Sequence, residues 1–578
     1  MSSPGFALAV PLTDSALLSA RPRLHSDLGT LRADEPRVWL GGGMPVTDMG
    51  SRGIVIGTLF SRPNGAACRS IVFDREMDED AQSMARRLLD QCWGAYIAVL
   101  TDPDERRASV LVDPSGLLPV YSVTTENHVV ISSNVRVLER CTHVHLRVDW
   151  KDVHAFLCRP ELRSRATCLE GVREVPPGSL TTIFGRSISE KLLWRPDAFM
   201  PVAPHPSFGD AANQLRETAI AVIGAWERSL GPVTVAASGG VDSSFICGAL
   251  HCGGAAFSCV TAATADPSGD ERPAVRRLAE HLDVPLAEGI YDPALFDPLE
   301  NASGALPRPS RKSFLNGVDR LFAKAADDLG AVTIMDGNGG DNLFCYLHSA
   351  APIADRLRAE FTLAGWASTF LDSCRVTGCD VPEMATAIWR RMTRPAGFPP
   401  WPADARLLSR PAPDFESAEP VAPWTRVPVG PHGGKHDHLA LIMRCQHHLH
   451  GLTSPMSRFS PLMSQPLMEL CLAIPAWLWC EGGLNRSVAR RAFADALPPS
   501  ILTRTAKAGP DSYIRAIFDR NRQAVRHSLM DGILARQGLL DLPAVEEALG
   551  IDAYTGDSII YRLLDLAEAE HWARAWQD

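Results

Sequence analysis

The stretch VTVAASGGVDSSFICGAL, residues 233 to 250, constrains the fold of this chain more than any other. Its β-branched start is typical of a buried strand, and its apolar end has helical spacing. A turn from strand to helix lies at the carboxyl edge of a parallel sheet, where ligands bind. Glycines let the backbone approach a ligand, and the unpaired N–H groups of a first helical turn bind anions. We therefore expect a phosphate-binding loop here.

Asp242 lies inside this loop, beside the predicted phosphate. A carboxylate and a phosphate repel each other unless a cation lies between them, and Mg²⁺ bound by both satisfies that need. A glycine turn followed by an ordinary helix cap remains the alternative, because S-G-G alone is compatible with it. The G-x-x-x-x-G-K-[ST] string of P-loop kinases and ATPases does not occur in the sequence.

Short strands and helical patterns alternate after this loop, with strands expected at 257–261 and 332–335 and a helix at 271–282. Such alternation predicts an α/β fold with a doubly wound parallel sheet. After about residue 350 the pattern becomes mostly helical, and the proline-rich stretch 394–431 is typical of a loop.

Strand-like runs with turn residues between them dominate the first third of the chain, at 53–59, 96–100, 109–112, 129–132 and 179–184. The proline-rich segment 195–209 separates them from the alternating part. We therefore predict a first domain at 1–194, a linker at 195–209 and a second domain at 210–578.

Charge and cysteine usage limit the class of protein. A net charge of −10 argues against a general nucleic-acid-binding protein, whose surface is usually basic. The 14 cysteines include no C-x-x-C pair, which is typical of a reduced intracellular protein. The N-terminus lacks the basic segment of a signal peptide, and the most apolar window, 467–480, is too short to span a bilayer. We expect a cytoplasmic protein with no nucleic-acid partner and no membrane span.

The string S-G-G-x-D-S resembles the pyrophosphate loop of N-type ATP pyrophosphatases, which cleave ATP between the α and β phosphates and adenylate a substrate. A second loop, IMDGNGGDNLF at 334–344, resembles the S-G-E-G-A-D-E-L-F loop of class B asparagine synthetases and β-lactam synthetases. The resemblance implies ATP and Mg²⁺ as cofactors, with Asp242 and Asp341 as metal ligands. It implies that ATP or pyrophosphate contacts Val235, Ala236, Ser238, Gly239, Gly240, Val241, Asp242, Ser243, Val260 and Gly337.

Two positions of the second loop depart from the family, because Asn338 and Asn342 replace glutamates of the asparagine synthetases. Further on, LPPSILTRTAKAG at 497–509 resembles the family's stretch that ends in R-x-x-K-x-G. The resemblance makes Lys507 a candidate catalytic residue that stabilises developing charge, whereas a solvated surface lysine is the alternative. Asn338, at the position of a family glutamate, is the second candidate. Asp270 and Glu271 either match a family pair or are ordinary acids of a first helical turn.

The first third of the chain also resembles this family. VLVDPSGLLPVYSV at 110–123 and CLEGVREVPPGSL at 168–180 are similar to segments of its glutaminase domain, an Ntn-hydrolase-like αββα fold. Glutamine-dependent members begin with Met-Cys, and the cysteine is their nucleophile. This chain begins Met1-Ser2-Ser3. A serine with a free amine attacks in other enzymes, but here we expect a degenerate domain that makes no ammonia, so that the amine belongs to the substrate.

Residues 451–475 are most similar to lasso peptide macrolactam synthetases. These enzymes adenylate an Asp or Glu side chain of a precursor peptide, whose N-terminal amine then closes a ring and releases AMP and pyrophosphate. The resemblance implies the precursor peptide, a leader-processing peptidase and a leader-binding protein as partners, and a peptide groove within 348–460. A small-molecule amide ligase, such as a β-lactam synthetase or an ammonia-dependent asparagine synthetase, is the alternative. A non-catalytic scaffold and a tRNA-modifying enzyme fit the motifs less well.

Two further features have a simpler interpretation. The segment 436–452 contains five histidines, which raises the possibility of a zinc site, but its apolar residues have the spacing of a helix face. His447, His448 and His450 are therefore expected in the core or against a peptide. Glu469 is expected to be a structural acid or to contact the substrate.

Overall fold

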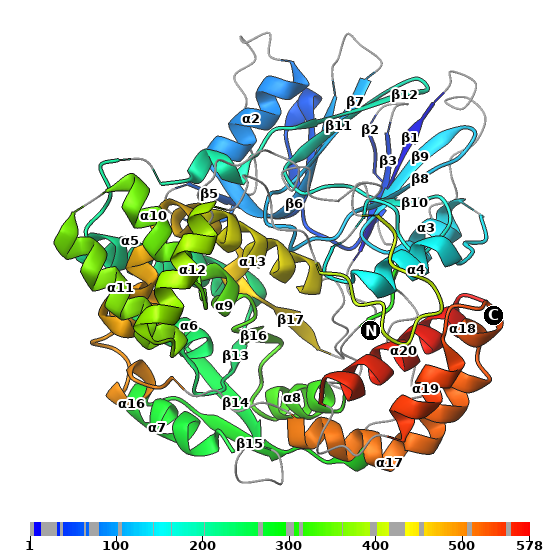
Figure 1. The fold of residues 1–578 in the computed structure, drawn as a ribbon. Coiled ribbons are helices and arrows are strands. Elements are labelled where there is room, and N and C mark those ends of the chain that lie inside the picture. Colours follow the sequence, from blue (N-terminus) through cyan, green and yellow to red (C-terminus); the bar gives the residue numbers. More distant parts are fainter. Residues whose placement is uncertain are drawn as a thin grey trace.

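The computed structural model describes residues 5–12, 32–34, 38–62, 65–68, 80–101, 107–142, 144–162, 164–201, 203–263, 270–295, 306–310, 316–360, 362–393, 402–414, 434–449, 456–505, 511–550 and 557–577. Figure 1 shows an upper lobe of antiparallel strands above a larger lobe built around a parallel sheet. The predicted α/β class with a parallel sheet is therefore confirmed.

The first lobe contains two six-stranded antiparallel sheets. One has the order β10-β8-β9-β1-β3-β2 and the other β12-β11-β7-β6-β5-β4. The first sheet consists of β1 (Phe6–Pro11), β2 (Arg32–Asp34), β3 (Val38–Gly42), β8 (Tyr121–Thr124), β9 (His128–Ser132) and β10 (Val172–Glu174). The second consists of β4 (Val46–Asp48), β5 (Gly53–Ser61), β6 (Cys92–Thr101), β7 (Arg107–Val112), β11 (Ser179–Phe184) and β12 (Ser187–Leu192). All five strands expected in this region are present.

Alternate side chains of these strands pack into different hydrophobic cores. In β1, Phe6, Leu8 and Val10 pack between the two sheets, whereas Ala7 and Ala9 face a separate core. Successive side chains of a strand point to opposite faces, so one strand serves both cores. Helices α3 (Val135–Thr142) and α4 (Trp150–Cys158) pack on the outer face of the first sheet, and α2 (Ala81–Gln91) packs on the outer face of the second. Helices thus flank a pair of stacked sheets.

The second lobe contains one parallel sheet of five strands in the order β15-β14-β13-β16-β17. Its strands are β13 (Val233–Ala236), β14 (Phe257–Ala263), β15 (Leu286–Ile290), β16 (Thr333–Asp336) and β17 (Ser457–Phe459). The sequence pattern predicted β13, β14 and β16 but not β15 or β17. The order runs outward from β13 in one direction and then resumes at β16 in the other, which is the doubly wound arrangement.

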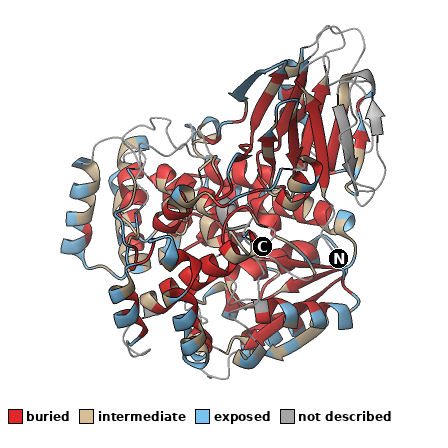
Figure 2. Cartoon of the chain, turned by 90° about the vertical axis from the view of Figure 1, so that its right-hand side faces the viewer, coloured by how far each residue is buried: buried red, intermediate tan, exposed pale blue. Residues whose placement is uncertain are grey.

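Helices cover both faces of this sheet. Val235, Cys259 and Met335 share a core with α6 (Val241–Cys252) and α7 (Arg272–Leu282). Val260 and Ile334 face the opposite core, with α8 (Asn316–Asp328). The central strands β14, β13 and β16 are buried on both sides, because right-handed connections place helices above and below the sheet, whereas the edge strands β15 and β17 are partly exposed (Figure 2).

Helices dominate after residue 350, as predicted, with the short strand β17 as the exception. They are α9 (Gly340–Leu343), α10 (Ala351–Ala359), α11 (Leu363–Thr377), α12 (Val381–Thr393), α13 (Gly434–Leu449), α14 (Gln465–Ala473), α15 (Ser487–Ala492), α16 (Pro499–Leu502), α17 (Asp511–Met530), α18 (Ile533–Arg536), α19 (Leu542–Leu549) and α20 (Asp557–Ala575). No helix in the described ranges combines the length and apolar character needed to cross a bilayer. The proline-rich stretch 394–431 lies largely outside the described residues.

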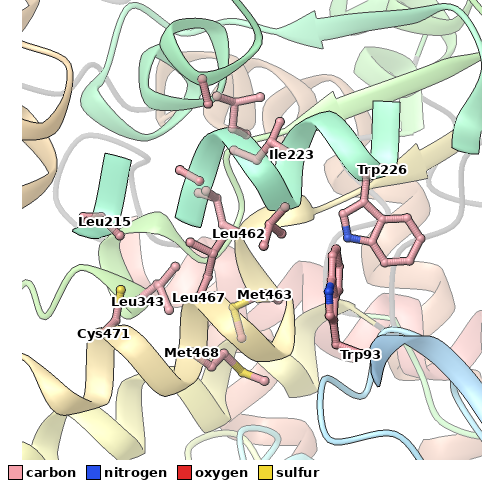
Figure 3. Close-up of a cluster of buried hydrophobic side chains, with 14 of the residues drawn as sticks. Trp93, Leu215, Ile223, Trp226, Leu343, Leu462, Met463, Leu467, Met468 and Cys471 are labelled. Atoms are coloured by element: carbon pink, nitrogen blue, oxygen red, sulfur yellow. The ribbon is translucent and has the colours of Figure 1, made fainter. Parts of the chain in front are cut away.

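Two hydrophobic cores extend across both lobes, and one of them is built around α5. Helix α5 (Phe208–Leu230) follows the predicted linker and packs against both lobes. Trp93 of β6 lies beside Trp226 of α5, with ring centroids 5.9 Å apart, and Phe60 of β5 lies 4.9 Å from the same tryptophan. Figure 3 shows this contact next to Met463 and Met468 of the second lobe. The predicted boundaries at 194 and 210 stay a prediction.

A buried carboxylate joins the lobes beside this core. Glu469 of α14 accepts hydrogen bonds from the Trp194 indole at 2.8 Å and from the Gln465 amide at 2.8 Å. It also pairs with Arg62, at 2.8 Å between Nη2 and Oε2. Of the two interpretations of Glu469, the structural one is supported, because each of its partners is a side chain that anchors the domain junction.

Glu469→Ala should therefore loosen the junction. The substitution leaves the Trp194 N–H and the Arg62 guanidinium without their acceptor, and breaking one side of a largely buried ion pair costs about 3 kcal/mol. We expect a lower melting temperature and faster limited proteolysis near residue 200. Glu190→Ala, which breaks a partly exposed pair with Arg165 on the first lobe, should change the melting temperature much less. Equal losses in the two variants would contradict the anchoring role.

Candidate active site

Two loops lie side by side where the strand order reverses. β13 and β16 are neighbouring parallel strands, so their carboxyl ends meet at the same edge of the sheet. The S-G-G-x-D-S loop follows β13, and the D-G-N-G-G-D loop follows β16. A reversal of this kind opens a crevice in which α/β proteins bind ligands. Both predicted loops thus lie at the same edge of the sheet, where one ligand can contact both of them.

The first loop has the geometry of an anion-binding turn. Gly239 has a φ of +64°, and a Cβ there would lie 2.6 Å from the Ala274 Cβ, so only glycine fits without strain. The Ser238 amide donates to the Ser243 hydroxyl at 3.1 Å, which folds the loop over the first turn of α6. Gly240 is the N-cap of α6, and the amides that follow it lack helical partners.

The second loop rests directly on the first. A Cβ on Gly337 would lie 2.8 Å from the Ser243 amide nitrogen and 3.1 Å from the Asp242 carbonyl carbon. Both are backbone atoms, which cannot move aside without shifting α6. Gly337 is therefore required by close approach, and it fixes the distance between the two loops.

Asp242 and Asp341 converge on one cationic group. Arg486 Nη1 donates to Asp242 Oδ2 at 2.9 Å, and the same nitrogen donates to Asp341 Oδ1. The arginine side chain is 7% exposed, and its guanidinium also lies 4.9 Å from the ring centroid of Tyr346. Two carboxylates that contact one nitrogen are close enough to bind a single metal ion together. The structure thus brings these two aspartates together, and their role as metal ligands stays a prediction.

Two arginines support the first loop: Arg504, which follows α16, and Arg490 of α15. Arg504 Nη1 donates to the Gly239 carbonyl at 3.2 Å, and Nη2 donates to Glu271 Oε1 at 3.0 Å. Arg490 in turn donates to the Arg504 carbonyl at 2.9 Å. Glu271 therefore positions Arg504, the arginine that contacts the first loop. Asp270 instead pairs with Arg272 at 2.9 Å near the surface. The signal for Arg504 was present in the sequence, because it is the arginine of the R-x-x-K-x-G match.

A series of hydrogen bonds between buried polar groups connects α14 to α9, the short helix that follows the second loop. Lys435 Nζ donates to the Cys471 carbonyl at 2.9 Å and to His438 Nδ1 at 3.1 Å. His438 Nε2 then donates to the Leu343 carbonyl of α9 at 2.7 Å. A lysine cannot accept, so this series assigns the ring proton of His438 to Nε2. Burial lowers the pKa of His438 well below its usual value, so the ring stays neutral.

The pH dependence of stability should report on Lys435. Burial lowers the pKa of its ammonium to about 8, whereas the unfolded value is near 10.4. Between these values the unfolded chain binds more protons, so the contribution of Lys435 to stability rises from pH 8 to about pH 10. As the pH rises over this range, we expect the melting temperature of the wild type to increase relative to that of Lys435→Met. A constant difference from pH 7 to 10 would contradict the shifted pKa.

The remaining predicted residues have the following places. Val235 and Val260 are buried in the two cores of the sheet, so only their backbones face the crevice, and Ala236 pairs with both Val260 and Asp336. Lys507, Ser2, His450 and the side chains of His447 and His448 lie outside the described residues. His436 and His438 are buried. Within the described ranges, no three His, Cys, Asp or Glu side chains gather as a metal site, and none of the 14 cysteines forms a disulfide.

Asn338 was predicted as a catalytic residue, and the structure gives it a partner that sequence reasoning missed. Its side-chain amide donates to Asp336 Oδ2 at 2.9 Å, and its backbone amide donates to Asp336 Oδ1 at 3.1 Å. Asp336 ends β16 and is 3% exposed. The loop is thus stabilised from within by a carboxylate.

Both loops lie within a part of the chain that matches a known protein family. The family model described as asparagine synthase matches residues 221–421 and 457–574, which together make up more than half of the chain. No curated protein matches significantly. A solved structure titled as the allosteric regulatory enzyme of purine biosynthesis is 10% identical, with a TM-score of 0.21, over 51% of this chain and 82% of its own. Glutamine phosphoribosylpyrophosphate amidotransferase from B. subtilis is 10% identical, with a TM-score of 0.20, over 68% and 94%. These two likenesses are too weak to support a conclusion.

Proposed function

Because this chain belongs to the asparagine synthase family, whose members are ATP-dependent ligases that form amide bonds, we propose that it closes a macrolactam ring in a ribosomal precursor peptide. The enzyme adenylates an Asp or Glu side chain of the peptide and releases pyrophosphate. The peptide's own N-terminal amine then displaces AMP. The observation that carries this proposal is the convergence of Asp242 and Asp341 on a single cation position at the switch point of the sheet.

The residues present fit ATP and Mg²⁺. Mg²⁺ binds through one or two carboxylates together with substrate phosphates, and two carboxylates are what the loops provide. The ion would neutralise the phosphates. The start of α6 supplies backbone N–H groups to the pyrophosphate, and Ser238 and Ser243 add hydroxyl donors. Arg486 lies at the same carboxylates and supplies a further positive charge to the leaving pyrophosphate.

In the second step, the neutral amine forms a C–N bond with the acyl carbon while the C–O bond to AMP breaks. AMP leaves with that oxygen, and the nitrogen releases one proton to solvent. A peptide amine has a pKa near 8, so a useful fraction is already neutral at pH 7. Binding both ends of one peptide supplies much of the rate by proximity. Lys507 is proposed to stabilise the charge of this transition state.

One feature of the second loop favours an amine that the substrate itself carries. Asn338 replaces a carboxylate of the family there, so the loop lacks that acid for activating a weak nucleophile. We propose that the first lobe, with its stacked sheets between helices, is a glutaminase-type domain of the Ntn-hydrolase class that has lost its chemistry. A leader-processing peptidase and a leader-binding protein would then supply the peptide with a free N-terminus.

The test uses a synthetic core peptide with a free N-terminal glycine and an Asp or Glu a few residues on. Incubation with ATP and Mg²⁺ should give a product lighter by one water, together with AMP and pyrophosphate. Acetylation of the peptide N-terminus should stop ring closure while pyrophosphate release continues. ADP instead of AMP, or a ring formed from the acetylated peptide, would contradict the proposal. Turnover of a free amino acid with ammonia instead would favour the small-molecule ligase.

A further inference from the structure

The carboxylate of Asp336 accepts four hydrogen bonds. Oδ1 accepts from the Ser460 hydroxyl at 2.6 Å and from the Asn338 backbone amide at 3.1 Å. Oδ2 accepts from Arg458 Nε at 2.6 Å and from the Asn338 side-chain amide at 2.9 Å. A carboxylate has about four lone-pair positions, and here all four are used. Asp336 therefore has no position left from which to take a proton from a substrate.

The guanidinium of Arg458 pairs with the Asp336 carboxylate. Arg458 of β17 lies between Asp336 and Asp319 of α8 and donates to both. The Asp336 carboxylate thus accepts from four kinds of donor: a guanidinium, a hydroxyl, a backbone amide and a side-chain amide. An ionised carboxylate accepts hydrogen bonds but cannot donate them.

The contact with Asp336 determines how the Asn338 side chain is turned. Only the NH₂ end of a carboxamide can donate to Asp336, so its oxygen must point the other way. No hydrogen-bond partner of that oxygen occurs in the described part of the chain, and Asn338 is half-buried in the loop between Gly337 and Gly339. The loop thus presents one oriented acceptor three residues before Asp341.

We propose that Asp336 is a positioning residue that turns the Asn338 carboxamide so that its oxygen accepts a hydrogen bond from the attacking amine. This inference rests on the proposed function, and it assigns the second step of the reaction to this loop. The hydrogen bond holds the amine with its lone pair toward the acyl carbon. It also accounts for Asn338 itself, because a glutamate or aspartate at this position would set a second negative charge against Asp336 Oδ2.

The orientation can be tested without any substrate. Asn338→Asp should lower the melting temperature at pH 7.5 through repulsion with Asp336. In the exchanged pair Asp336→Asn with Asn338→Asp, an amide again faces a carboxylate, so this double variant should recover most of the loss. An Asn338→Asp protein as stable as the wild type, or an exchanged pair that is less stable than both single variants, would overturn the orientation.

The chemical role is tested with two nucleophiles. Hydroxylamine attacks an acyl adenylate from solution, forming a hydroxamate and releasing AMP and one proton, and it needs no positioned peptide amine. With the core peptide, ATP and Mg²⁺, Asn338→Ala should slow ring closure about 100-fold, as expected for a misplaced nucleophile. Hydroxamate formation in the same variant should stay within about threefold of the wild type, since adenylation is intact.

Ser460→Ala is the matched control, because it removes one hydrogen bond from Asp336 Oδ1 and leaves the carboxamide contact in place. Its ring closure should fall less than about fivefold. Equal losses of ring closure and hydroxamate in Asn338→Ala would overturn the positioning role. Wild-type protein that fails to close the ring would instead contradict the proposed function. In that case, the same comparison with the amine that the enzyme does accept still decides the role of Asn338.

Discussion

Replacement of Asp242 or Asp341 by asparagine is expected to reduce pyrophosphate release at least about 1,000-fold, equivalent to about 4 kcal/mol of transition-state stabilisation. An asparagine oxygen remains a possible ligand, but it carries no charge to balance Mg²⁺ against the phosphates. The protein should stay folded, because Arg486 retains an ion pair with the other aspartate. Initial rates of pyrophosphate release and circular dichroism would measure the two effects separately.

Asp283→Asn is the matched control for these variants. Asp283 ends α7 with a φ of 53°, a left-handed conformation that asparagine accepts readily, and it has no place in the site. Its pyrophosphate release should equal that of the wild type. Near-normal Mg²⁺-dependent turnover in Asp242→Asn or Asp341→Asn would refute a metal ion shared between the two loops.

Gly337→Ala is expected to have the second-largest effect. The new methyl group would press on the backbone of Asp242 and Ser243, and overpacking against a rigid backbone costs about 2 kcal/mol. The second loop must then move away from the first, which separates Asp242 from Asp341. A displacement of about 1 Å at a reacting centre reduces rates about 100-fold. Thermal unfolding and pyrophosphate release would both be measured.

Gly209→Ala provides the comparison for this glycine. Gly209 lies near the start of α5, and the nearest atom to an added Cβ is 3.9 Å away. Alanine is the better helix former there, so this variant should be as stable as the wild type or more stable by up to about 1 kcal/mol. If Gly337→Ala behaves in the same way, the close contact between the two loops is not required for turnover.

The sequence predicted the elements whose signal is local. The strand, glycine turn and helix around Ser238 lie within one short stretch, and the same holds for the loop that ends at Phe344. Parallel strands bring such loops to one edge, so the meeting of Asp242 with Asp341 followed from the fold class. Strand β17 has three residues and no alternating pattern, so nothing in its composition distinguished it from a loop.

The residues that orient the site could not be found in this way. Arg486 lies 244 positions after Asp242, in a stretch with other arginines that reads as a solvated helix. Arg458 lies 122 positions after Asp336, and Asp336 itself reads as the end of a buried strand. Each gains its role from a contact between distant segments, and such contacts leave no periodicity in the chain. Lys507, the remaining candidate, stays a prediction.

The aromatic contact between the lobes bears on how such a protein changes over evolutionary time. Phe60 and Trp93 of the first lobe complete the core around Trp226, so a chain shortened to its second lobe would expose this face to water. Large exposed apolar faces promote aggregation. A lineage whose first lobe loses its chemistry must therefore keep that lobe, because the second lobe needs it to cover its core. Selection then preserves the strands of the first lobe for their contribution to the folding of the second.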